Sequence, residues 1–451
     1  MSSIARIRVL LAIVVALTLV LPARHTDARG PDLRMRPNDG PVGGIVTARG
    51  EGFASGENVH LWWSEPELEV ATVLADGDGA FSVDFTVPDV PPGAYEVTAI
   101  GETTGETAVA SDEFDVTVPD DHRRDGPHPE PSAVVLGTPA PLSSELAPNA
   151  CDLDGTRAVA VSTSTGLEAA LADALPGDHI ALADGTYRGN FVAENNGSAT
   201  DPIALCGGRG AVIDGGAWSE SGYALHLRGD HWAVSGITVT NAQKGVMADG
   251  VTGIVIDGIE VHTIGHEAIY FRTHSTDNTI QNSEIHDTGL DNEKFGEGIY
   301  LGTAVSNWSR YTDGEPDRSD RNRVLANRIW NTTSESIDAK EGSEGGLIEG
   351  NVFDGSMLSG ADSWVDVKGN GYVVRGNTGT ASPQDGFQTH VIDDMRWGRG
   401  NVFEGNVAIV NGPGAGFYIH QPDESGNIVR CDNRVEGAAF GLTNLEGGCN
   451  G

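Results

Sequence analysis

The sequence predicts an all-β protein, a right-handed parallel β-helix preceded by a small β-sandwich. Segments with alternating apolar residues recur through the second half of the chain, each with an asparagine at a turn. These asparagines are Asn282, Asn327, Asn351, Asn377, Asn406 and Asn433. A unit of roughly 20–30 residues without a helical period is typical of one coil of a solenoid, in which neighbouring coils bury each other's apolar faces. The longest interval contains a polar insertion at 303–321, which we expect to wall one side of a cleft.

The chain begins with a predicted secretory signal peptide at residues 1–28. Two arginines precede an apolar run at 9–21, and small residues follow it. The run is too short for a typical membrane span. We therefore expect a secreted, extracellular protein that is not held in a membrane after cleavage.

Residues 31–118 form the next predicted domain, an Ig-like β-sandwich. Short alternating stretches are separated there by Gly, Pro, Asp and Glu turns, which is typical of a sandwich. The segments 50–59 and 78–88 resemble patterns found in bacterial secreted Ig-like modules. We expect a spacer, or a carbohydrate-binding accessory in which Trp62 and Trp63 stack on sugars. Residues 119–149, rich in Pro, Asp and Ser, predict an extended linker.

The remaining chain, 150–451, is the predicted β-helix. A segment with helical period at 162–175 is expected to cap the open end of its core. The four cysteines, Cys151, Cys206, Cys431 and Cys449, predict disulfides in an exported chain. Pairing each cysteine with its nearer neighbour would staple the two ends of the solenoid, but three pairings remain open.

The net charge of −37 argues against nucleic acid as a partner, because binding to phosphates requires a basic surface. The charge would also repel polyanions unless cations and local basic residues reverse the field. We expect a monomer.

One outward face of the coils carries most of the chemically versatile side chains. Lys340 and Lys368, two of only four lysines, fall at the same point of consecutive repeats. Alternation places the residues between the inward apolar pairs toward solvent. The catalytic candidates on this face are Lys340, Lys368, Arg272, His390 and Tyr300, and the substrate-binding candidates are Tyr270, Asp338, Asp366, Gln388, Tyr418, His420 and Arg228.

A second column lies five residues before the lysine position and consists of Glu267, Glu297 and Glu335. Stacked carboxylates repel one another unless solvent or a cation intervenes. Ca²⁺, which takes oxygen ligands, would suit them. The column is therefore a candidate calcium site.

The opening of the predicted β-helix, GLEAALADALPGDHIALADGTYRGNF at 166–191, resembles that of polysaccharide lyase family six, the alginate lyases and chondroitinase B, and of other pectate-lyase-like β-helices. The resemblance implies that Glu335 binds calcium and that Lys340, five residues later, is the general base. Glu297 would be a ligand from the preceding coil. Two positions depart from the family pattern: Thr333 replaces a second acid, and Lys368 replaces a catalytic arginine.

The resulting hypothesis is β-elimination on a uronate polysaccharide. Ca²⁺ with Arg272 or Lys368 would neutralise the uronate carboxylate so that Lys340 can remove the C5 proton. We expect nearby cations to lower the pKa of Lys340 and Asp338 to oppose them. Lys368, His390 or Tyr300 would return a proton to O4.

Three alternatives remain open. A glycoside hydrolase could use Asp338 and Asp366, whose carboxyls on neighbouring coils would lie about 5 Å apart. A C5-epimerase would share the proton abstraction. A non-catalytic adhesin would bind glycans without cleaving them.

Overall fold

The computed structural model describes residues 32–36, 39–41, 43–64, 68–88, 93–101, 109–117, 142–148, 151, 157–392 and 396–450. The predicted signal peptide and most of the predicted linker lie outside these residues. The chain divides into two units, 1–132 and 133–451, and each has its own hydrophobic core. No helix in the described ranges is long and apolar enough to cross a bilayer.

The first unit is a two-sheet β-sandwich, as predicted. One sheet contains β1 (Asp32–Arg36), β3 (Ile45–Glu51) and β6 (Phe81–Thr86); the other contains β2 (Asp39–Pro41), β4 (Asn58–Trp63), β5 (Leu68–Leu74), β7 (Gly93–Gly101) and β8 (Val109–Thr117). Trp63 is wholly buried in the core and packs against Phe85, Tyr95 and Phe114. It cannot stack on a sugar, and only Trp62 of the pair is partly exposed.

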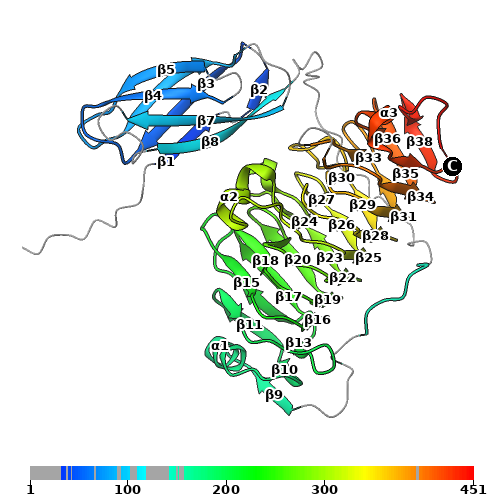
Figure 1. Cartoon of the computed structure of the whole chain (residues 1–451). Coiled ribbons are helices and arrows are strands. Elements are labelled where there is room, and N and C mark those ends of the chain that lie inside the picture. Colours follow the sequence, from blue (N-terminus) through cyan, green and yellow to red (C-terminus); the bar gives the residue numbers. More distant parts are fainter. Residues whose placement is uncertain are drawn as a thin grey trace, which may run out of the picture. The chain divides into compact units, whose positions relative to one another are not determined.

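The second unit is a parallel β-helix of three sheets, whose coils stack in chain order (Figure 1). The first sheet contains β9 (Arg157–Val161), β10 (Asp178–Leu182), β13 (Ile203–Cys206), β16 (Trp232–Ser235), β19 (Val255–Asp257), β22 (Thr279–Gln281), β25 (Arg323–Leu325), β28 (Leu347–Glu349), β31 (Val373–Arg375), β34 (Val402–Glu404) and β37 (Ile428–Val429). The second contains β11 (Gly185–Arg188), β14 (Ala211–Asp214), β17 (Thr238–Ala242), β20 (Glu260–Ile264), β23 (Glu284–His286), β26 (Arg328–Trp330), β29 (Val352–Asp354), β32 (Thr378–Thr380), β35 (Val407–Gly412) and β38 (Arg434–Ala438).

The third sheet carries the columns singled out from the sequence. It contains β12 (Phe191–Ala193), β15 (Tyr223–Leu227), β18 (Lys244–Asp249), β21 (Ile269–Arg272), β24 (Ile299–Leu301), β27 (Ile337–Ala339), β30 (Val365–Val367), β33 (Phe387–Thr389), β36 (Ala415–Ile419) and β39 (Gly441–Thr443). Short helices lie between strands: η3 (Glu293–Phe295), η4 (Val305–Asn307), α2 (Trp308–Tyr311) and α3 (Pro422–Ser425).

Helix α1 (Ser164–Ala172) confirms the predicted helical segment at the start of the β-helix. The Thr163 hydroxyl accepts a hydrogen bond from the Gly166 N–H at 3.1 Å, which satisfies one of the free donors at the helix N-terminus. Leu167 and Leu171 are buried in the core of the solenoid. The helix therefore covers apolar side chains that would otherwise end in solvent.

A ladder of buried asparagines joins five successive coils. In Asn327, Asn351, Asn377 and Asn406, each side-chain amide donates to the side-chain oxygen of the next asparagine, ending at Asn433, over 2.9–3.0 Å. Each amide also donates to a backbone carbonyl. Asn282 does not belong to this column, because the neighbouring Ser283 takes the equivalent place and donates its N–H to Asn327. The predicted repeat is therefore displaced by one residue at that coil.

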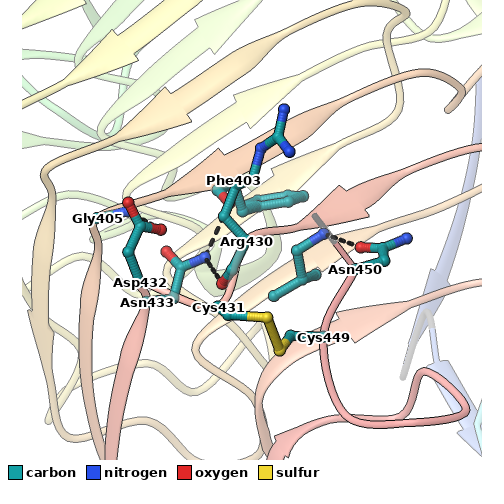
Figure 2. Close-up of a disulfide and its surroundings, with 9 residues drawn as sticks. Phe403, Gly405, Arg430, Cys431, Asp432, Asn433, Cys449 and Asn450 are labelled. Carbon is teal, nitrogen blue, oxygen red and sulfur yellow. Dashed lines mark hydrogen bonds between the residues drawn. A yellow bond between two sulfur atoms is a disulfide. The ribbon is translucent and has the colours of Figure 1, made fainter.

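Disulfides link Cys151 with Cys206 and Cys431 with Cys449, the pairing in which each cysteine joins its nearer neighbour. Figure 2 shows the second bridge beside the end of the ladder, where the Asn433 amide donates to Phe403 O and Arg430 O at 2.8 Å. The Asn450 side chain accepts the Val429 N–H at 2.7 Å. The bridge therefore holds the last residues against the final coil.

Part of the predicted linker is bound to the β-helix. Residues 142–148 lie across the first sheet, where the buried Glu349 accepts the hydroxyl and N–H of Ser143 at 2.7 and 2.5 Å and also bonds Ser144. The Gln281 amide bonds both the N–H and the carbonyl of Ala147 at 2.8 and 2.9 Å. This segment is therefore part of the β-helix unit, and the predicted linker boundary at 149 is too late.

Asn377→Ala should destabilise the β-helix strongly. The substitution leaves the Asn351 amide and the Ile348 carbonyl without their partners, and each buried unsatisfied group costs about 1–3 kcal/mol. We expect a fall in thermal midpoint of several degrees by calorimetry. Asn307→Ala, at an exposed asparagine without a capping bond, is the control; equal midpoints for both variants would contradict a supporting role of the ladder.

Glu349→Gln should loosen residues 142–148. A neutral amide accepts hydrogen bonds more weakly than a carboxylate, and it loses the ion pair with Arg375. We expect limited proteolysis to cut within 133–150 faster than in the wild type, measured by mass spectrometry of the fragments. The control is Glu404→Gln, which changes the other carboxylate near Arg375. The protease should cut this variant at the wild-type rate.

Candidate active site

The third sheet brings the predicted outward residues into register. Tyr270, Tyr300, Asp338, Asp366, Gln388 and Tyr418 are successive partners on strands β21, β24, β27, β30, β33 and β36. Lys340 and Lys368 directly follow β27 and β30. The expected neighbourhood of the two lysines is therefore confirmed.

The column is a packed polar layer, and not the solvent-facing ribbon that alternation predicts. Asp338 is 1% exposed, Gln388 2%, Asp366 3%, and Tyr270 and Arg272 6%. Alternation distinguishes the core from the opposite face of a strand, but it does not show what covers that face. Long side chains and the insertion at 303–321 cover much of it here.

Two lysines and a histidine neutralise the two buried aspartates. Lys340 Nζ lies 2.8 Å from Asp338 Oδ2. Lys368 Nζ lies 3.1 Å from the same oxygen and 2.9 Å from Asp366 Oδ2. His390 Nδ1 lies 2.9 Å from both oxygens of Asp366. The lysine side chains are 15% exposed and His390 37%, so the cationic groups form the accessible surface of the cluster.

The charge network raises the pKa of Lys340 well above its ordinary value. Burial acts to lower this pKa, but the carboxylates of Asp338, Glu341 and Glu335 outweigh it. The expected opposition of Asp338 is therefore confirmed, and it prevails over the lowering of the Lys340 pKa expected from nearby cations.

The pKa values of the other members of the network are also shifted toward their charged forms. Burial acts to lower the pKa of Lys368, yet Asp338 and Asp366 raise it overall. Asp366 raises the pKa of His390. In turn, burial acts to raise the pKa of Asp366, but His390 and Lys368 hold it well below its usual range.

Tyr300 lies beside Lys340, with the amine 5.0 Å from the centre of its ring. Burial and the neighbouring Tyr270 and Asp338 raise the pKa of its hydroxyl well above the ordinary value, so the phenol is neutral. Gly302 occupies the column position before Lys340, at φ +83°. A side chain is disfavoured at this φ, and its absence leaves room beside the Lys340 stem.

The three glutamates of the second column do not stay together: Glu297 and Glu335 lie close to each other, whereas Glu267 has a different partner. Glu297, Glu335 and Asp338 each offer an oxygen within 4.8 Å of the others. Burial and the surrounding carboxylates raise the pKa of Glu297 well above its usual value, and burial followed by Asp338 raises that of Glu335. Glu267 pairs instead with Lys244 and is not among the three acids whose oxygens converge.

The carboxylate oxygens of Glu297, Glu335 and Asp338 are a candidate cation site. Glu297 Oε2 is buried and has no hydrogen-bond partner among the described residues. An orphaned carboxylate oxygen, with two more carboxylates in reach, suits a hard cation that takes oxygen ligands. Glu297, Glu335 and Asp338 therefore fit calcium better than the expected set with Glu267.

Arg272 is buried. Its Nε donates to Asp249 Oδ1 at 2.6 Å and its Nη2 to Oδ2 at 3.2 Å, and Tyr311 covers it, with the guanidinium carbon 4.0 Å from the ring centre. The expectation that Arg272 neutralises a substrate carboxylate is therefore not supported, because the guanidinium is buried beneath Tyr311.

The remaining predicted residues lie farther from the lysines. Arg228 is exposed beyond β15 and pairs with Glu194 at 2.5 Å, four strands before β27 in the sheet. Tyr418 is exposed on β36. His420 accepts the Val391 N–H at 3.1 Å, and its ring lies 5.7 Å from that of His390. These residues extend the face in both directions but do not contact Lys340.

The insertion at 303–321 is hydrogen-bonded to the coils beside the site, and its role as a wall stays a prediction. The carboxylate of the fully buried Asp317 accepts the N–H groups of Thr273 and His274 at 2.9 and 2.7 Å. Glu341 accepts the Val305 N–H at 2.6 Å. The insertion is therefore fixed to the β-helix.

A solved structure identifies the family of the β-helix. The alginate lyase from Paenibacillus sp. str. FPU-7 is similar to this chain, with 35% sequence identity and a TM-score of 0.55. The similarity covers 64% of this chain and 99% of the lyase. The chain belongs to the same family as this lyase.

Other similarities are weaker. The family-six alginate lyase AlyGC has 19% identity and a TM-score of 0.38, covering 60% of this chain and 40% of its own. A family-six lyase from human gut microbiota has 14% identity and a TM-score of 0.36, covering 62% and 82%. The macroglobulin-like domain model matches residues 32–116, in accord with the Ig-like sandwich. No curated protein matches the chain.

Sequence reasoning missed several residues that shape the site. Lys244 takes Glu267 out of the acidic column, and His226 Nε2 lies 2.8 Å from Asp249 Oδ2, the carboxylate that pairs with Arg272. Lys244 carried a detectable signal, because it is one of only four lysines. Nothing in the repeat pattern indicates its partner, which depends on side-chain direction.

The buried carboxyl of Glu297 should make stability depend on pH when a chelator is present. Its folded pKa lies above its unfolded value, so its contribution is fully present below pH of about 4 and is lost as pH rises through the folded pKa. We expect the thermal midpoint of the wild type to fall more between about pH 5 and pH 8 than that of Glu297→Gln, because the variant lacks the carboxyl whose pKa is raised.

Glu436→Gln provides the control for that experiment, since Glu436 lies on β38 in the second sheet, away from the acidic cluster. Parallel pH profiles for the wild type and Glu297→Gln would contradict the raised pKa.

Proposed function

We propose that this protein is a secreted polysaccharide lyase that cleaves a uronate polysaccharide by β-elimination, with alginate as the first substrate to test. The observation that carries the proposal is the juxtaposition of Tyr300, Lys340 and Lys368 on one face of the third sheet. The 35% identity to an alginate lyase supports it, and the apolar run at 9–21 supports secretion.

In this proposal Lys340 and Tyr300 transfer the protons. Lys340 Nζ removes the C5 proton of the uronate, the C–H electron pair forms the C4=C5 bond, and the C4–O4 bond breaks toward oxygen. Tyr300 donates its hydroxyl proton to the departing O4. The protonated Lys340, beside the Tyr300 ring, then returns a proton to the phenolate, which restores both groups.

Lys340 must lose its proton before it can act as the base. Asp338 and its neighbours now favour the charged amine. The substrate carboxylate also needs neutralising charge, which Lys368 and His390 supply at the accessible edge of the cluster. The acidic protein thus presents a locally cationic surface to a polyanion.

Calcium is proposed as the cofactor, held by Glu297, Glu335 and Asp338. When bound, calcium would supply positive charge beside Lys340 and offset the carboxylates that favour protonation of the lysine.

The geometry disfavours the hydrolase alternative. A general acid needs a carboxyl that stays protonated, which requires a raised pKa, whereas that of Asp366 is lowered. Asp338 is 1% exposed and contacts both lysines, so neither carboxyl is placed to meet a glycosidic oxygen. A C5-epimerase and a non-catalytic adhesin remain alternatives.

Lys340→Met should abolish turnover while substrate still binds. Loss of a general acid–base group costs about 10²–10⁴-fold in rate. The assay incubates the protein with alginate, pectate or dermatan sulfate, with and without chelator, and follows the ultraviolet absorbance of the new C=C bond. Binding is measured by calorimetry with alginate.

Lys294→Met is the matched control, because Lys294 lies in η3 outside the charge network. Unsaturated products at wild-type rate from Lys340→Met would refute its role. Binding without unsaturated product from any polyuronate by the wild type would favour the adhesin, and exchange of the C5 proton without cleavage would favour the epimerase.

A further inference from the structure

We infer that Arg272 is a positioning residue, which holds the insertion at 303–321 and the Tyr300 ring in one fixed arrangement. The inference rests on the proposed function where it concerns turnover, and on the structure alone where it concerns the insertion.

Three tyrosines from separate segments surround the guanidinium. Its carbon lies 4.0 Å from the ring centre of Tyr311, 5.4 Å from that of Tyr270 and 6.0 Å from that of Tyr223. Tyr311 belongs to α2 in the insertion, whereas Tyr270 and Tyr223 belong to β21 and β15. A cation over aromatic faces is attracted to them, more strongly when it is desolvated. Arg272 therefore joins the insertion to the sheet.

Asp249 fixes the direction of the guanidinium. It accepts from Nε and Nη2, and this paired geometry holds the planar group in one orientation. The hydroxyl of Thr273 donates to the same carboxylate at 3.1 Å, and His226 approaches its other oxygen at 2.8 Å. Arg272 thus has a rigid support on the side away from Tyr311.

The contacts continue from Arg272 to the proposed proton donor. The rings of Tyr270 and Tyr300 meet edge to face at 4.6 Å, and the Tyr270 hydroxyl lies 3.3 Å from the Thr303 hydroxyl at the start of the insertion. Tyr300 in turn packs against Lys340. One buried cation therefore supports both the insertion at 303–321 and the ring of the proposed proton donor.

This arrangement separates the roles of two neighbouring residues. Tyr311 touches the wall side of Arg272 only, so its loss should affect substrate binding. Arg272 also supports Tyr270 and, through it, Tyr300, so its loss should affect the chemical step as well.

The first measurement is hydrogen exchange of peptides covering 303–321. Arg272→Met keeps the stem and removes the charge, and Asp249 retains His226. We expect exchange in this segment to rise about tenfold, because a desolvated cation–π contact and a charge-assisted hydrogen bond are lost. Arg188→Met, at an 80% exposed arginine, should leave it unchanged. Wild-type exchange in Arg272→Met would overturn the inference.

The second measurement is steady-state cleavage of alginate. Arg272→Met should lower kcat about tenfold through Tyr300, whereas Tyr311→Leu should raise KM and leave kcat near the wild-type value. Equal effects of the two variants on kcat would overturn the proposed link to Tyr300. Tyr311→Phe keeps the aromatic ring, so this variant should have the kcat and KM of the wild type.

The two arms distinguish the possible failures. An inactive wild type would refute the proposed function, and the exchange experiment would still decide whether Arg272 holds the insertion. If Arg272→Met does not fold, Tyr311→Leu should raise exchange in 303–321 on its own, and unchanged exchange in that variant would overturn the inference.

Discussion

Parallel pairing between successive coils determines where every functional side chain of the β-helix lies. The pairing is held at the turns by buried asparagine amides, each bonded to the next coil and to a backbone carbonyl. A shift of one residue in any strand would move its outward side chains to the core. The ladder therefore protects the register that brings Tyr300, Asp338 and Asp366 into one column.

That register brings charged side chains together in a buried cluster, which costs desolvation free energy. Buried ion pairs cost desolvation energy that their attraction scarcely repays, and apolar residues of similar size often serve stability as well. Two aspartates, two lysines and a histidine at one place in the third sheet are thus poorly explained by folding alone. Perturbed pKa values in a partly accessible cluster are typical of active sites, and this favours catalysis over simple glycan adhesion.

The sequence anticipated the site most successfully where backbone periodicity decided the outcome. The spacing of Lys340 and Lys368 placed them on adjacent coils, and alternation identified their column. It failed where side-chain direction decided. Glu267 pairs with Lys244 and not with Glu297, and Arg272 lies under Tyr311. Asp338, and not a nearby cation, sets the direction of the Lys340 pKa. These partners come from different coils or from the insertion, and no local pattern encodes them.

The sequence by itself determined the two-domain architecture, the solenoid and the face on which the chemistry lies, because repeat length and alternation follow directly from strand geometry. It left three disulfide pairings open, and the tertiary structure places each cysteine beside its nearer partner. Only the tertiary structure decided which outward residues are buried, which carboxylates share a site and which cations are already paired. Those outcomes depend on distances between side chains of separate coils, and Coulomb interactions and desolvation change steeply over such distances.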